Sequence, residues 1–154
     1  MPYSFPAPFH QLAALGASFT LSLVFFVDTQ SDRAMSTDPR LQQLIHFFEH
    51  IDPSNVSLLA DVYTPEAFFK DPFNEVHGIE AITRIFQHMF RQVDSPRFII
   101  THSVMQDDQA FLTWDFLFRM KRFSAQEQCI RGATHVRFAI DGRVNFHRDY
   151  WGCR

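Results

Sequence analysis

Asp71 has the position of a residue that could exchange protons. It stands directly before Pro72, where a short apolar stretch that begins at Ala67 ends among phenylalanines. Burial among aromatic side chains disfavours a charged carboxylate and moves its pKa toward neutral pH, where an acid or a base is most useful. The sequence leaves a second interpretation open, in which Asp71 accepts hydrogen bonds from the loop at 72–78 and has a structural role.

The last predicted strand also has ionisable side chains on one of its faces. Side chains of a strand alternate between its two faces, so His147, Asp149 and Trp151 share one face. A histidine two residues from an aspartate could form an acid-base pair. In the structural alternative, Asp149 forms an ion pair with an arginine such as Arg131 or Arg148.

A strand predicted at 110–121 presents two different faces. One face contains Asp115 and Arg119, which would join the site if this face met a cavity. The other face is apolar and is expected to meet the helices or a partner subunit. It consists of Leu112, Trp114, Phe116, Phe118 and Met120.

The composition is that of one globular domain rich in aromatic residues. Of the 154 residues, 46% are apolar and 20% charged, and 19 are phenylalanine. So many rings suit either a cavity with aromatic walls, which would bind an apolar ligand, or a core that the rings fill themselves. The formal charge of −3 and the lack of any run of Lys or Arg argue against nucleic-acid binding.

Motifs for a cofactor or a metal are absent from the sequence, so neither is expected. His46 and His50 are four residues apart, but they lie on a polar helix face with Glu49 and lack the HExxH order of a zinc site. Two cysteines, Cys129 and Cys153, give no disulfide framework and favour reduced thiols in the cytoplasm.

Residues 1–34 differ from the rest of the chain. Leu12–Val27 is an uncharged run that suits the hydrophobic part of a signal peptide but is short for a membrane span of about 30 Å. No Lys or Arg precedes it, although secretory signals normally have one. We expect a non-native, disordered or signal-like extension, followed by a single domain at 35–154 that starts functionally at Met35 and does not insert stably into a membrane. Export or anchoring is the alternative if the extension is a true signal.

Helices come first along the chain and strands follow. Apolar residues at helical spacing predict three helices, at 38–51, 54–63 and 78–93. Alternating and aromatic residues predict five strands, at 67–71, 97–105, 110–121, 126–139 and 143–151. This order indicates an α+β fold with an antiparallel sheet curled around segregated helices.

Three motifs, in this order and spacing, resemble the nuclear transport factor 2-like superfamily, and most closely its SnoaL-like and ketosteroid-isomerase-like branch. They are Lys70-Asp71-Pro72-Phe73, V-x-G-x-x-A-I at Val76–Ile82, and His147-Arg148-Asp149-Tyr150-Trp151. The resemblance covers about residues 38–151. It implies a cone-shaped, cystatin-like domain in which a curved, mixed sheet wraps around three N-terminal helices, with a deep apolar pocket and dimer contacts through the sheet. Relatives with this ending usually continue, so a C-terminal segment is expected to be missing after Arg154.

The resemblance also implies a site. It places Asp71 at the position of the proton-shuttling aspartate of ketosteroid isomerases and turns His147 and Asp149 toward the pocket. The two oxyanion donors of those enzymes fall on Phe47 and Thr134. One such donor is worth about 2.7–4 kcal/mol of barrier, so steroid isomerisation is not expected. The implied ligand pocket consists of Phe47, Tyr63, Phe69, Phe86, Trp114, Thr134 and Trp151.

Two functions are therefore expected from the sequence. The first is a cofactor-independent isomerase, cyclase, dehydratase or hydrolase that acts on a small apolar molecule. Asp71 would be its acid-base group, with His147 and Asp149 as catalytic partners. The second is a non-catalytic module of the same fold that binds a small ligand or dimerises. In either case, the partners of the protein would be a small apolar ligand and a second copy of the chain.

Overall fold

The computed structural model describes residues 36–121 and 124–152. The elements in chain order are α1 (Pro39–Glu49), a 3₁₀ turn η1 (Val56–Leu58), α2 (Leu59–Val62), β1 (Tyr63–Lys70), β2 (Glu75–His77), α3 (Ile79–Gln92), β3 (Val93–Gln106), β4 (Gln109–Met120), β5 (Ser124–Phe138) and β6 (Val144–Trp151). Helices thus precede the long strands in the described part of the chain, and the expected α+β class is confirmed. The extension expected at 1–34 lies outside the described residues.

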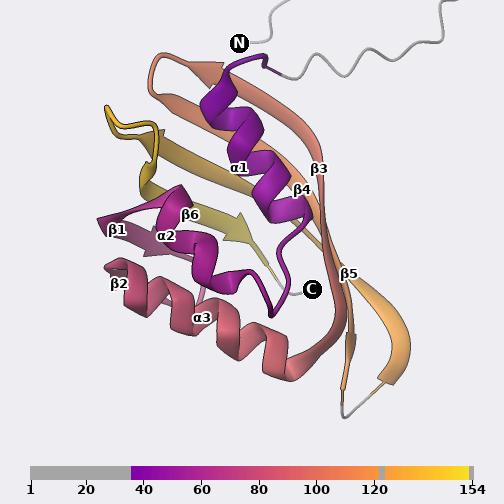
Figure 1. Cartoon of the computed structure of the whole chain (residues 1–154). Helices are drawn as coiled ribbons and strands as arrows, with labels where there is room; N and C mark the ends of the chain where they lie inside the picture. Colours follow the sequence, from indigo (N-terminus) through magenta and orange to yellow (C-terminus); the bar gives the residue numbers. More distant parts are fainter. Residues whose placement is uncertain (1–35, 122–123, 153–154) are drawn as a thin grey trace, which may run out of the picture. The chain divides into compact units, whose positions relative to one another are not determined.

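The six strands of the described residues form one mixed sheet in the order β2-β1-β6-β5-β4-β3 (Figure 1). Strands β1 and β6 run parallel, whereas the other neighbours are antiparallel. Strand β6 therefore connects the first strand of the sheet to the long β3–β4–β5 meander. The sequence patterns missed β2, which has three residues and pairs with the end of β1, because so short a strand has too few residues to show a period.

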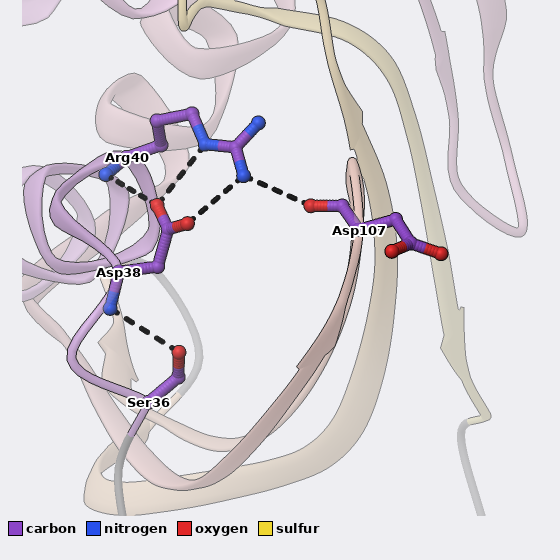
Figure 2. A network of polar contacts seen from close by, with 4 residues as sticks. All are labelled: Ser36, Asp38, Arg40 and Asp107. Atoms are coloured by element: carbon purple, nitrogen blue, oxygen red, sulfur yellow. Dashed lines mark hydrogen bonds and ion pairs between the residues drawn. The ribbon is translucent and has the colours of Figure 1, made fainter.

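Helix α1 begins with a cap that also holds it against the sheet. Asp38 is the N-cap, and its Oδ1 accepts a 2.9 Å hydrogen bond from the backbone N–H of Arg40. The Arg40 guanidinium pairs with the same carboxylate and donates a 2.9 Å hydrogen bond to the backbone oxygen of Asp107, between β3 and β4 (Figure 2). The buried face of α1 consists of Leu41, Leu44, Ile45 and Phe48, as its apolar spacing predicts.

The prediction of a second helix at 54–63 is only partly correct. Residues 56–62 form the 3₁₀ turn and α2, but Tyr63 already belongs to β1. Pro65 inside β1 has no N–H to donate, and it lies where the register of β1 against β6 shifts, between Tyr63 and Phe68. The spacing of the apolar residues fits a helix, but pairing with the distant strand β6 decides the structure here.

Helices α1 and α3 lie over the same face of the sheet (Figure 1). The apolar face of β4 is the one that meets them, and its Trp114, Phe116 and Phe118 are buried. The opposite face contains Asp115, which forms a 3.5 Å ion pair with Arg131, and the exposed Arg119. Asp115 and Arg119 therefore do not join the site. No helix in the described ranges is long and apolar enough to cross a bilayer.

Candidate functional site

A cavity of about 600 Å³ lies between the helices and the inner face of the sheet. Apolar side chains from α1, β1, α3, β3, β4 and β6 form most of its wall. Its volume lies in the range of small-molecule sites in proteins. The polar side chains that reach it are Asp71, Asn74, His88, Gln92, Thr134, His147 and Asp149.

Five side chains form one continuous hydrogen-bonded chain along the sheet, which we call the polar network. The Tyr63 hydroxyl lies 2.8 Å from His147 Nδ1, and His147 Nε2 lies 2.8 Å from Asp149 Oδ1. Thr134 Oγ1 donates to the same Asp149 oxygen at 2.5 Å and accepts a 2.8 Å hydrogen bond from Trp114 Nε1. Strands β1, β6, β5 and β4 thus each contribute to the network.

The register of the strands explains why these residues meet. Thr134 of β5 pairs directly with Asp149 of β6, so their side chains share a face. His147 precedes Asp149 by two residues, so its side chain lies on the same face of β6. The parallel partner of β6 is β1, which brings Tyr63 within reach of His147.

Protonation in the polar network follows from burial and from the donors available. Burial, and after it the charge of Asp149, raises the pKa of Tyr63 well above its ordinary value of 10.0, so this side chain remains a neutral phenol. An ionised Asp149 can only accept hydrogen bonds, so a neutral His147 has its proton on Nε2 and accepts from the Tyr63 hydroxyl at Nδ1. Both ring nitrogens are then occupied.

One carboxylate oxygen of Asp149 has no hydrogen-bond partner among the described residues. Its Oδ1 accepts from both His147 and Thr134, whereas no residue of the described ranges forms a hydrogen bond with Oδ2. The side chain is 16% exposed and lines the cavity. The fixed Oδ1 orients the carboxylate, so that Oδ2 is a positioned acceptor.

Asp71 also lines the cavity, but its carboxylate is bound by its own loop. Oδ1 accepts from the backbone N–H groups of Phe73 and Asn74, at 2.7 and 2.6 Å. The Asn74 side-chain amide donates to both carboxylate oxygens. The structural interpretation of Asp71 as a cap of the loop after β1 is therefore observed, together with its position at the cavity.

The residues expected at the ligand pocket do not all reach it. Phe69, Phe86, Trp114, Thr134 and Trp151 line the cavity. Tyr63 does not, because it is fully buried behind His147. Phe47 does not either: on a helix the next residue points about 100° away, and the cavity side of α1 is occupied by Phe48.

Gly132 was not identified from the sequence, although it makes room for Trp114. The two residues pair across β4 and β5, and a β-carbon at position 132 would lie 2.4 Å from the indole ring. Glycine therefore allows the indole to lie over β5, where its Nε1 reaches Thr134. A glycine within a strand pattern is a sign of such a close approach and could have indicated this position.

The histidines outside the cavity form other contacts. His50 Nδ1 lies 2.8 Å from the backbone oxygen of His46, and no group of three or more potential metal ligands occurs among the described residues. His135 stacks on Phe111 on the outer face of the sheet and lies 2.9 Å from Gln109. Burial, and then the nearby arginines, lower the pKa of His135.

Comparison with known proteins gives a family and a fold. Residues 44–147 match the sequence model of the SnoaL-like domain. None of the curated proteins compared with the chain matches it significantly.

Several solved structures are similar. One is a hypothetical protein from Catenulispora acidiphila with a ketosteroid isomerase-like fold, in complex with trimethylamine: its TM-score is 0.66 at 13% identity, over 76% of this chain and 88% of that one. Another, from Jannaschia, is provisionally named a SnoaL-like polyketide cyclase: its TM-score is 0.65 at 15% identity, over 73% and 84%. A third, from Agrobacterium tumefaciens, is provisionally named an isomerase of the SnoaL-like family: its TM-score is 0.59 at 12% identity, over 74% and 95%. At these identities the likeness shows the fold.

Proposed function

The chain belongs to the SnoaL-like domain family, and we propose that its cavity binds a small, mostly apolar molecule and moves a proton on it without a cofactor. The reaction class is that of an isomerase, cyclase, dehydratase or hydrolase. Relatives of the same fold are provisionally named a polyketide cyclase and an isomerase, which supports this range of reactions.

The observation that carries the proposal is that Asp149 lines an apolar cavity while its Oδ2 has no hydrogen-bond partner among the described residues. A base needs an acceptor that a substrate can reach, and Oδ2 of Asp149 is such an acceptor. Thr134 and His147 hold the other oxygen, so no reorganisation of the carboxylate is needed when the substrate binds. Apolar side chains form most of the cavity wall around this carboxylate.

The proton moves between the substrate and Asp149 in this proposal. Asp149 Oδ2 takes a proton from an acidic carbon of the substrate, and returning it elsewhere completes an isomerisation. A ring closure or the loss of water can follow the same first step, and hydrolysis would use Asp149 to activate a water molecule. His147 acts as a positioning residue, because its proton on Nε2 stabilises the charge of the carboxylate.

Asp71 is the second candidate for the base. It occupies the position of the proton-shuttling aspartate in the family resemblance, and it lines the same cavity. Three donor groups of its own loop already occupy its lone pairs, and the Asn74 amide donates to both of its oxygens, so a substrate finds neither oxygen unpaired. Asp149 is therefore the stronger candidate.

A simple chemical probe tests the proposal without knowledge of the natural substrate. In 5-nitrobenzisoxazole, removal of the C3 proton by a base breaks the N–O bond, and the released oxygen becomes a coloured phenolate. The full chain is expected to accelerate this reaction, and Asp149→Asn to reduce the rate about 100-fold, the contribution of a positioned general base. The rate is followed by absorbance, and unfolding is measured in parallel.

Matched variants locate the base. Asp115→Asn removes the same charge from the outer face of the sheet and should leave the rate unchanged. Asp71→Asn should have a smaller effect than Asp149→Asn. Full activity in Asp149→Asn would overturn the assignment, and a selective loss in Asp71→Asn would move the base to that residue.

A non-catalytic binding module is the alternative, and one observation favours it. Phe47 and Thr134 stand at the two oxyanion-donor positions of the resemblance, Phe47 does not reach the cavity, and Thr134 donates to Asp149 instead. In this case the probe would quench tryptophan fluorescence on binding but would not react.

We also propose a cytoplasmic location. Cys129 is an exposed free thiol, which suits a reducing compartment.

A further inference from the structure

We propose that the natural ligand of the cavity is an organic cation, an amine or quaternary ammonium group on an apolar body. This inference rests on the proposed function, since it concerns the ligand of the same cavity. It names a class of ligand that neither the fold nor the family specifies.

The permanently charged side chains that line the cavity are of one sign, and Arg91 of α3 lies outside the lining, 3.4 Å from the lining residue His88. The lining includes the carboxylates of Asp71 and Asp149 but no Lys or Arg among the described residues. The arginines on the neighbouring strands belong to the outer face of the sheet, where Arg131 pairs with Asp115 and Arg148 lies 4.9 Å over the ring of Tyr150. The lining histidines His88 and His147 are positive only when protonated, so an anionic ligand would meet two carboxylates and no permanent counter-charge.

Asp149 is the group that lacks a permanent ion-pair partner, which a bound cation would supply. A mostly buried carboxylate is costly unless it is paired, and its only ion-pair partner in the described ranges is His147, which is charged only when protonated. Protonation of His147 would neutralise one of the two cavity carboxylates and leave the other. A bound ammonium group beside Oδ2 would supply the missing positive charge without any proton transfer.

Aromatic rings next to Asp149 provide the second part of a cation site. Trp151 is two residues further along the same face of β6, and Trp114 connects to Asp149 through Thr134. Phe73 meets Trp151 edge to face at 5.2 Å and 74°, so that two rings stand nearly at right angles at the cavity wall. Aromatic faces attract ammonium groups, and tryptophan does so most strongly.

Three probes of nearly equal shape test the charge preference. They are phenyltrimethylammonium, its neutral isostere tert-butylbenzene, and the anion 2-methyl-2-phenylpropanoate. Both tryptophans of the chain, Trp114 and Trp151, line the cavity, so fluorescence titration reports on this site directly. The full chain should bind the cation at least as tightly as the neutral probe and should not bind the anion measurably.

Variants show whether Asp149 causes the preference. Asp149→Asn should lower the affinity for the cation at least tenfold and change the affinity for tert-butylbenzene by less than twofold. The unchanged affinity for the neutral probe then verifies that the cavity stays intact. The charge-matched control Asp115→Asn should change neither affinity. Binding of the neutral probe without the cation, or an equal loss of both in Asp149→Asn, would overturn the proposal.

The test of the ligand class can fail while the test of the catalytic role succeeds, and the reverse is also possible. Phenyltrimethylammonium should inhibit the reaction of 5-nitrobenzisoxazole competitively. Turnover that this cation does not inhibit would overturn the ligand class and leave the base in place. Selective cation binding without any turnover would support the ligand class and defeat the catalytic role.

Discussion

At the scale of single residues, His147 has no ring nitrogen free for a substrate. Tyr63 occupies Nδ1 and Asp149 occupies Nε2, and the ring of Phe69 stacks on the imidazole at 4.7 Å. The histidine therefore acts through Asp149, whose orientation it fixes. Tyr63 in turn fixes the tautomer of His147, although it does not touch the cavity.

Tyr63→Phe tests this role of the buried hydroxyl. The change leaves Nδ1 of His147 without its donor in a buried place, which should lower the free energy of unfolding by about 1–3 kcal/mol. Urea unfolding measures the loss. Tyr150→Phe is the matched control, because Tyr150 is 47% exposed and lies on the other face of β6, and it should have little effect. Equal losses in both variants would contradict the prediction.

The sequence predicts some parts of the site, whereas other parts depend on contacts that no local pattern encodes. The alternation of β6 put His147 and Asp149 on one face, and the structure has them hydrogen-bonded. Tyr63 was expected in the pocket, yet its place behind His147 depends on the parallel pairing of β1 with β6, which no local pattern encodes. Which oxygens of Asp71 and Asp149 remain free is likewise decided by partners and distances rather than by residue type.

At the scale of elements, the start of α1 depends on a charged cap. A hydrogen bond from the Arg40 side chain is the main reason why the pKa of Asp38 is lowered from its ordinary value of 3.8, and burial opposes this shift. Because the folded-state pKa is the lower one, the stabilisation is fully present above about pH 4. It is lost as the pH falls through the folded-state pKa.

Asp38→Asn isolates the charge of this cap, because asparagine is also a good N-cap. The wild type should be more stable than the variant at pH 7, and the difference should shrink as the pH falls below about 4. Urea unfolding at a series of pH values measures it. Glu66→Gln removes one exposed carboxylate of β1 and serves as the charge control. A difference that is independent of pH would contradict the role of the ion pair.

The sequence predicted most elements but not all of their ends. Helices α1 and α3 and strands β3 to β6 follow strong periodic patterns, and they begin and end within a few residues of the expected positions. The errors fall between residues 54 and 77, where α2 is short and β2 was expected as loop. The end of α2 depends on the pairing of β1 with the distant strand β6, whereas β2 forms a local hairpin with β1 and is too short to show a period.

At the scale of the whole molecule, a homodimer through the sheet stays a prediction. The outer face of the sheet exposes apolar side chains, with Val104 65% and Phe111 50% exposed. Light scattering at micromolar concentration should give about twice the chain mass of 18.1 kDa. Phe111→Asp should give the monomer, because a charge at this position opposes burial.

The control for this prediction is another exposed apolar residue. Ile140 lies in the turn between β5 and β6 rather than on a strand of the sheet, and Ile140→Asp should leave the dimer intact. A monomeric wild type would show the prediction to be wrong. Loss of the dimer in both variants would mean that the outer face is not the specific contact.

The position of β6 has a consequence for how the protein is made. This strand lies between β1 and β5, yet it is the last of the six to leave the ribosome. Until β6 has left the ribosome, the β1–β2 hairpin and the β3–β5 meander cannot join into one sheet. The edges of β1 and β5 that β6 later pairs with are then open, and this interval of synthesis is when the chain is most exposed to misassociation and to capture by chaperones.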